Sequence, residues 1–107
     1  MPDLLWDRSF AFEQSGEDTE LLKELLDLLK SSSLSDFEKI KAGLAADDGE
    51  AVADGAHSIK GAAASLGVEG LRAVAHAIEK MGRAGQQADV DVAELEDLIS
   101  QLDTISI

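Results

Sequence analysis

Apolar residues recur every three or four positions along most of this chain, which is the spacing of one face of an α-helix. Leucines at this spacing predict a helix over residues 17–30, where acidic residues also favour the helix start. A run of serines follows, and Ser35 with Glu38 three positions later matches a capping box. We therefore expect a break or kink at residues 31–33 and a second helix that ends near Ala46.

Three further helices are predicted over residues 50–66, 69–83 and about 90–102, separated by turns that contain glycine. Each has a single apolar stripe: Val52, Ala56, Ile59, Ala63 and Leu66 in the first, Leu71, Val74, Ala75, Ile78 and Met81 in the second, and Val92, Leu95, Leu98, Ile99 and Leu102 in the third. Short turns between helices of similar length favour antiparallel neighbours. The predicted fold class is therefore all-α, an antiparallel up-and-down four-helix bundle. The N-terminal segment around Trp6 should add a short helix or cap at one end.

Composition and charge limit the classes of partner and the cellular compartment that we expect for this chain. The 107 residues suit a single domain over residues 1–107, and the absence of cysteine excludes disulfides and thiolate metal sites. The formal net charge of −13 disfavours nucleic acid and anionic membranes as partners. No apolar run reaches the roughly 20 residues needed to span a bilayer. We expect a soluble cytoplasmic protein, a monomer that binds neither nucleic acid nor membranes.

One stretch, AHSIKGAAASLG, places polar residues in a helix of small apolar ones. His57 and Lys60 lie on a stripe beside the core stripe. Their neighbours on that stripe are the small residues Ala53 and Ala64, which should leave His57 at the core edge with one side of its ring in solvent. Gly61 lies on the same face and costs the helix about 1 kcal/mol relative to alanine. Close approach of a partner would explain a glycine there.

The following helix brings further polar side chains to the same groove. If the two helices are antiparallel, His57 lies level with Glu79 across the turn between them. Lys60 then lies level with His76. One stripe of the second helix consists of Arg72, His76, Glu79 and Arg83. Each of these residues also has an ordinary interpretation: a solvated or carbonyl-bonded histidine, a surface lysine, or a glutamate paired with a nearby arginine.

The motif His57-x-x-Lys60-Gly61, followed by Gly67, resembles the signature of histidine phosphotransfer (HPt) domains. These domains are the helical intermediates of bacterial two-component phosphorelays. The resemblance covers the chain from about Leu21 to the last helix. It implies that His57 accepts the phosphoryl group, that Lys60 lies near that group, and that Gly61 admits the partner.

A second set of residues resembles the phosphotransfer domain of chemotaxis-type histidine kinases. There, a histidine and a glutamate on the following helix orient the phospho-accepting histidine, and His76 and Glu79 stand at the matching spacing. Ser65 stands where free-standing HPt domains often have asparagine, which weakens one helix-end contact. With no nucleotide-binding domain before its end at Ile107, the chain is expected to be either a complete small protein or one domain of a larger kinase. The residues expected to dock a partner are Ala53, Gly61, Ala64, Ser65 and Arg72.

The function implied by the resemblance is that of a phosphorelay intermediate. Its partners would be a histidine kinase and the receiver domain of a response regulator, between which His57 carries the phosphoryl group. The sequence has no nucleotide-binding motif, so we expect a carrier that is not an enzyme. It would have no cofactor of its own, and the partner would supply Mg²⁺. Two alternatives stay open: a helical adaptor that is not phosphorylated, and a metal-binding bundle. The metal ligands would be Asp54, His57, His76 and Glu79.

Overall fold

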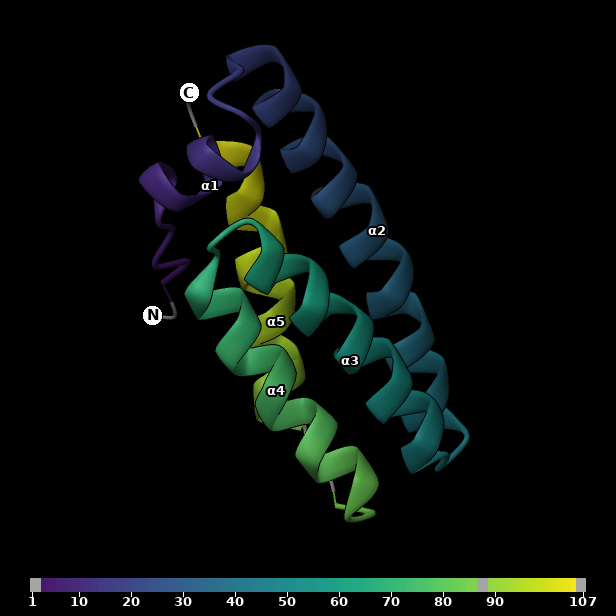
Figure 1. Cartoon of the computed structure of the whole chain (residues 1–107). Helices are drawn as coiled ribbons and strands as arrows, with labels where there is room; N and C mark the ends of the chain where they lie inside the picture. Colours follow the sequence, from purple (N-terminus) through teal and green to yellow (C-terminus); the bar gives the residue numbers. More distant parts are fainter. Residues whose placement is uncertain (1–2, 87–88, 106–107) are drawn as a thin grey trace.

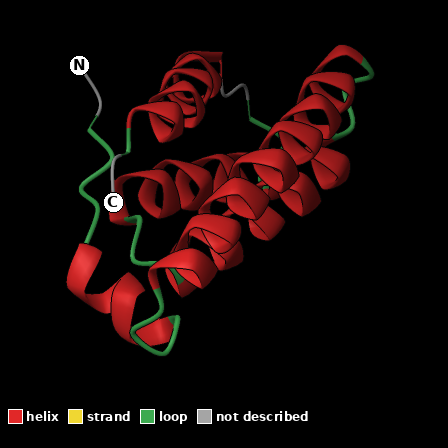
Figure 2. Cartoon of the chain, turned by 90° about the horizontal axis from the view of Figure 1, so that it is seen from above, coloured by secondary structure: helices red, strands yellow, loops and turns green. Residues whose placement is uncertain are grey.

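Five α-helices and a short 3₁₀ helix follow one another in the computed structural model, which describes residues 3–86 and 89–105 apart from the side chains of residues 89 and 90. They are α1 (Arg8–Gln14), α2 (Thr19–Ala45), α3 (Gly49–Ser65), α4 (Glu69–Arg83), α5 (Asp89–Gln101) and the 3₁₀ helix Leu102–Thr104. Helices α2 to α5 run alternately up and down, and α1 lies across one end of them (Figure 1, Figure 2). The predicted all-α antiparallel four-helix bundle with an additional N-terminal helix is confirmed.

The predicted apolar stripes form the core between these helices. The buried side chains are mainly aliphatic: Leu22, Leu26, Leu29, Phe37 and Ile40 from α2, Val52, Ala56, Ile59 and Ala63 from α3, Leu71, Ala75 and Ile78 from α4, and Leu95, Leu98 and Ile99 from α5. Aspartates begin three of the helices, because the side chains of Asp7, Asp18 and Asp48 accept backbone N–H groups in the first turns of α1, α2 and α3. The capping residues thus account for where these helices start, and the apolar periodicity accounts for which faces they bury.

The break predicted at residues 31–33 is wrong, because α2 continues through the serines without interruption. Ser33 is fully buried and extends the apolar stripe between Leu29 and Phe37. Packing against the core therefore overrides the weak helix preference of serine. Ser32 also donates its hydroxyl to the carbonyl of Leu29, which lets a serine remain inside a helix. The predicted capping box consequently lies within a continuous helix.

Residues 3–7, called the strap below, close the turn between α3 and α4. The indole N–H of Trp6 donates to the carbonyl of Leu66 at 3.1 Å. The backbone N–H of Asp7 donates to the carbonyl of Gly67 at 2.9 Å. Both carbonyls lie at the end of α3, where a helix leaves its last carbonyls without partners of its own. The strap thus completes the C-terminus of α3.

The strap also supplies an acceptor at the start of α4. The N-cap residue of α4 is Val68, whose aliphatic side chain cannot accept a hydrogen bond. Instead, the backbone N–H of Gly70 donates to the carbonyl of Leu4 at 2.7 Å. A Cβ atom on Gly70 would overlap the carbonyl oxygen of Asp3 and lie 2.8 Å from that of Leu4. A glycine at this position therefore lets one segment lie against both helix ends.

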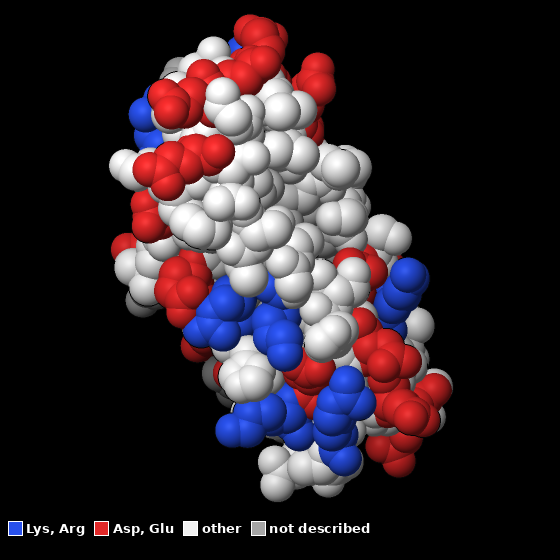
Figure 3. Space-filling model, viewed as in Figure 1, with Lys and Arg blue, Asp and Glu red and all other residues white. Residues whose placement is uncertain are grey.

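Charge is distributed unevenly over the surface. On the face shown in Figure 3, acidic side chains gather toward the two ends and along the edges, and a broad uncharged region lies between them over α2 and α3. Lysine and arginine side chains gather beside this region, over α4. The net charge of −13 is therefore not spread evenly over this face. Within the part of the chain that the structure describes, no helix is both long and apolar enough to cross a membrane.

Gly70→Ala is expected to displace the strap and to destabilise the fold by about 2 kcal/mol, because the added methyl group overlaps the strap backbone. Trp6 is the single tryptophan of the chain, so its fluorescence should shift to longer wavelength when the strap is displaced. Urea unfolding followed by circular dichroism measures the loss of stability.

Gly61→Ala is the matched control for Gly70→Ala. Apart from its two chain neighbours and the backbone of its own helix, no atom of the described residues lies within 4 Å of a Cβ placed on Gly61. Alanine should therefore stabilise the helix there by about 1 kcal/mol. A Gly70→Ala protein with wild-type stability and unchanged Trp6 fluorescence would contradict the proposed contact between the strap and the turn.

Candidate functional site

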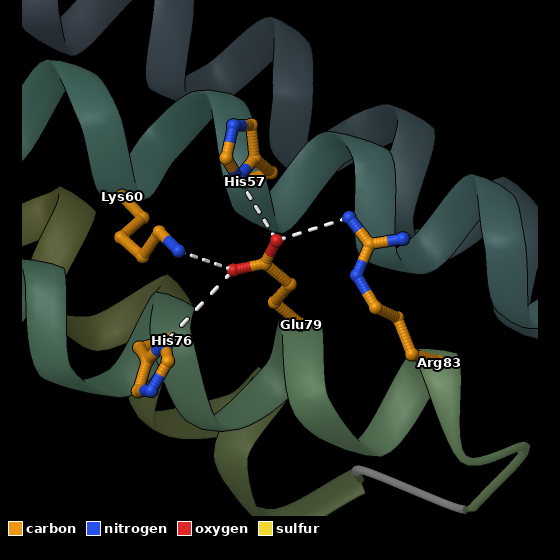
Figure 4. A network of polar contacts seen from close by, with 5 residues as sticks. All are labelled: His57, Lys60, His76, Glu79 and Arg83. Atoms are coloured by element: carbon orange, nitrogen blue, oxygen red, sulfur yellow. Dashed lines mark hydrogen bonds and ion pairs between the residues drawn. The ribbon is translucent and has the colours of Figure 1, made fainter.

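His57 lies in the middle of α3, and 62% of its side chain is exposed. Its Nδ1 atom is 2.8 Å from Oε2 of Glu79 on α4, which confirms the pairing predicted from antiparallel geometry. In Figure 4, the second ring nitrogen, Nε2, points away from Glu79. The site therefore holds one ring nitrogen and leaves the other accessible.

Glu79 is buried, with 8% of its side chain exposed, and its carboxylate receives donors from both helices. Lys60 donates to Oε1 at 2.6 Å, and Arg83 donates to Oε2 at 3.1 Å. The hydrogen bond from Lys60 is the main reason that the pKa of Glu79 is lowered to about 2, and Arg83 and His57 add to this effect against the opposing effect of burial. Glu79 is therefore ionised at neutral pH.

The ionised carboxylate determines which nitrogen of His57 carries the hydrogen. A carboxylate in this state only accepts hydrogen bonds, so the Nδ1 atom at 2.8 Å must be the donor. The neutral ring then has its lone pair on Nε2, the nitrogen that points away from Glu79. The result is an exposed, unprotonated nitrogen in a fixed orientation, which is the arrangement of a nucleophile.

Comparison with known proteins identifies the family. A model of the Hpt domain family matches residues 24–105 of the chain. The chain belongs to the Hpt domain family. Its structure is similar to the crystal structure of histidine-containing phosphotransfer protein B (HptB) from Pseudomonas aeruginosa PAO1, with a TM-score of 0.85, 22% sequence identity, and coverage of 94% of this chain and 89% of that chain. This likeness shows a shared fold. None of the curated proteins matches the sequence.

Two of the predicted site residues of this Hpt domain meet at Glu79. Lys60 and His76 were expected to lie level with each other, and both face the same carboxylate oxygen, Oε1. Lys60 is hydrogen-bonded to that oxygen, whereas Nδ1 of His76 is 3.9 Å away, too far for a hydrogen bond. His76 is thus a neighbour of the network, with 48% of its side chain exposed, and Lys60 is a full member.

Arg83 is the site residue that sequence reasoning did not assign. It follows Glu79 by four positions, and this spacing, which brings side chains together on a helix, was the available signal. Arg72, which was assigned to partner docking, donates to Glu69 at 2.5 Å, and its role in docking stays a prediction. The two arginines share a stripe of α4, but each binds the carboxylate that lies one turn before it.

The predicted docking residues lie partly at the surface. Three of them are exposed on α3: Gly61, Ala64 and Ser65. Ala53 is a wrong assignment, because it is fully buried against α4. A Cβ on Gly82 of α4 would lie 2.9 Å from the backbone nitrogen of Ala53, so a glycine in α4 allows the two helices to close over this alanine. The exposed small residues therefore extend from His57 toward the C-terminus of α3 and not toward its start.

The metal-binding alternative finds no support in this arrangement. Among the residues that the structure describes, no three histidine, aspartate or glutamate side chains are grouped so that they could hold a metal ion. Glu79 would have been one ligand, and its oxygens are bonded to the cations of Lys60 and Arg83. The polar cluster is a hydrogen-bonded network around a carboxylate.

Acid should remove the stabilisation that ionised Glu79 contributes. The pKa is about 2 in the folded protein and 4.5 when unperturbed, so the stabilisation is present above about pH 4.5 and is lost as the pH falls toward 2. Over this window, the free energy of unfolding should fall more in the wild type than in Glu79→Gln, by up to about 3 kcal/mol. Urea unfolding at a series of pH values measures the difference.

Glu69→Gln is the control for this titration. Glu69 also pairs with an arginine, Arg72, but 56% of its side chain is exposed, and solvent screens such a pair. The substitution should therefore change the pH dependence far less. Parallel curves for the wild type and Glu79→Gln throughout the acid window would contradict the network around Glu79.

Proposed function

We propose that His57 carries the phosphoryl group in this Hpt domain. It would receive the group from a kinase or from a phosphorylated receiver aspartate, and pass it to the receiver domain of a response regulator. The observation that carries the proposal is the hydrogen bond from His57 Nδ1 to ionised Glu79, because it leaves Nε2 exposed and nucleophilic. Membership of the Hpt family supports it, since Hpt domains are phosphorelay intermediates that act as carriers.

The proposed step forms one bond and breaks another. The lone pair of His57 Nε2 bonds to the phosphorus of an aspartyl phosphate, and the phosphorus–oxygen bond to the aspartate breaks. The leaving carboxylate takes the electron pair of that bond. The proton on Nδ1 stays on the ring, so the ring becomes positively charged as the nitrogen–phosphorus bond forms. Glu79 then binds the charged ring more strongly than the neutral one, which favours the transition state.

Lys60 and Arg83 limit an unwanted effect of the carboxylate. A lone carboxylate beside His57 would favour the protonated ring, in which Nε2 carries a hydrogen and cannot attack phosphorus. Two cations on Glu79 reduce this bias because they balance its negative charge. They also add positive charge to the region that the phosphoryl group would occupy after transfer.

The surface beside His57 suits a transient partner. On the side of His57 toward the C-terminus of α3, a shallow hollow between α2 and α3 is lined by Ala62, Ser65 and Leu28, among others, and Leu28 is 64% exposed. Figure 3 shows an uncharged region over the same two helices, α2 and α3. In the proposal, a receiver domain docks here and supplies Mg²⁺ and the charges that stabilise transfer. Apolar contact at the centre should make binding weak and only modestly dependent on salt.

His57→Gln is expected to abolish acid-labile phosphorylation and to leave the fold intact, since the side chain is largely exposed. The protein is incubated with receiver domains charged by acetyl phosphate, and the label that appears on it is followed. His76→Gln is the matched control on the next helix and should still be labelled. Label that persists on His57→Gln would place the acceptor elsewhere. A wild-type protein that takes no label from any receiver would favour the unphosphorylated adaptor.

Ala64→Glu is expected to slow transfer from the receiver by about tenfold, because it adds a carboxylate to the surface that meets an acidic pocket. Ala93→Glu adds the same charge at an exposed alanine of α5 and should transfer at the wild-type rate. A higher receiver concentration should restore the rate of Ala64→Glu, because docking and not chemistry is weakened. Equal rates for the two variants would place the docking surface elsewhere.

A further inference from the structure

Asp36 of α2 is a second buried carboxylate, which the proposed transfer does not use. Among the described residues, Asp36 and Glu79 are the buried charged ones, with 7% and 6% of the whole residue exposed. Each binds one of two consecutive residues of α3. Glu79 accepts from His57, and Asp36 accepts from the hydroxyl of Ser58 at 2.6 Å. A buried carboxylate is costly unless it is well bonded, so its place beside the His57 helix requires an explanation.

The contact between α2 and α3 is close at this point. A Cβ on Gly55 of α3 would lie 3.0 Å from the backbone carbonyl oxygen of Asp36 and 2.9 Å from Cγ1 of Ile40. Ser58 lies almost one turn further along α3 and reaches the carboxylate of the same aspartate. Lys39 places a cation near Asp36, with Nζ 3.6 Å from Oδ1, but 69% of the Lys39 side chain is exposed. Ser58 is therefore the partner that ties Asp36 to the helix that carries His57.

The two buried carboxylates bind α3 from the two helices packed against it, α2 and α4. His57 is bonded to α4, and the next residue, Ser58, is bonded to α2. A side chain about 6 Å from the axis moves by roughly 1 Å when its helix rotates by about 10°. A displacement of about 1 Å can slow an enzyme-like transfer by as much as 100-fold. Hydrogen bonds to helices on both sides of α3 add to its core packing and oppose small rotations more than a bond on one side alone would.

We infer that Asp36, acting through Ser58, is a positioning residue for His57. It sets the rotation of α3 at which Nδ1 of His57 meets Glu79 and Nε2 faces outward. This inference rests on the proposed role of His57 as the phosphoryl carrier. It assigns to α2 a part in the transfer that is independent of any contact between Asp36 and the phosphoryl group.

Ser58→Ala tests the inference, with Ser100→Ala as the control. Both serines are exposed, but Ser100 lies on α5 and belongs neither to the network around His57 nor to the proposed docking surface. Nitrogen NMR of the His57 ring should show one tautomer, with hydrogen on Nδ1, in the wild type and in Ser100→Ala. Ser58→Ala should show a mixture of the two tautomers. Its transfer rate at saturating phosphorylated receiver should fall about three- to tenfold, with an unchanged receiver concentration at half-maximal rate.

Two further variants separate the hydrogen bond from its surroundings. Ser58→Thr keeps the hydroxyl and should restore the wild-type tautomer and rate. Asp36→Asn keeps an oxygen acceptor for Ser58 but removes the charge, and it should retain most of the rate. A wild-type ring spectrum together with a wild-type saturating rate in Ser58→Ala would overturn the inference. So would equal losses in Ser58→Ala and Ser58→Thr.

The outcome is distinguishable from failure of the proposed function. If wild-type protein takes no label on His57, the proposed carrier role fails. The ring spectra still report whether Ser58 and Asp36 orient the imidazole. If His57 of the wild type is labelled, and Ser58→Ala has the ring spectrum and the saturating rate of the wild type, the positioning role of Asp36 fails. The carrier role of His57 then stands.

Discussion

A carboxylate buried between two helices has to be matched by donors, because leaving it unpaired away from water is costly. The donors for Glu79 come from both helices, His57 and Lys60 from α3 and Arg83 from α4. One carboxylate therefore joins the helices, orients the imidazole ring and keeps its own charge at neutral pH. These roles cannot be separated. Protonation of Glu79 would weaken the acceptor for His57 and leave two cations without their partner.

The network depends on the register of α3 against α4. An α-helix turns by about 100° per residue, so a shift of one residue in α4 would turn Glu79 away from His57. The strap limits that freedom at the turn between the helices. Trp6 and Asp7 complete the end of α3, and Leu4 completes the start of α4. Residues far from His57 in the sequence therefore contribute to its geometry, through backbone groups that the turn would otherwise leave unpaired.

Periodicity was sufficient to predict most of the fold. The inward stripe predicted for α3 is buried throughout, because a helix with one apolar face has one stable way to meet a core. The pairing of His57 with Glu79 was also predictable, since antiparallel helices have the same rise per residue. The serines of α2 were misjudged because local preference favours a break there, whereas burial of Ser33 between Leu29 and Phe37 favours a continuous helix.

The error at Ala53 arises from packing between helices, which a single helical pattern does not contain. Ala53 lies on the same stripe as His57, and its burial depends on how closely α4 approaches, which Gly82 allows.

Which arginine of α4 pairs with Glu79 depends on the other carboxylates that each arginine can reach. Arg72 has Glu69 within one turn, so it is already bonded, and Arg83 is left as the partner of Glu79.

The exposure of His57 and the pairing of its neighbours together explain why the proposed transfer needs a partner. Phosphoryl transfer requires positive charge around the oxygens of the moving group. Lys60 and Arg83 are bonded to Glu79, so much of their charge is already balanced within the network. A ring that is 62% exposed is also surrounded by water, in which charges interact weakly. A docked receiver would change both conditions, since it excludes water and brings its own charges. In the proposed relay, the exposure that makes His57 accessible to a receiver would therefore also keep the transfer slow until the receiver binds.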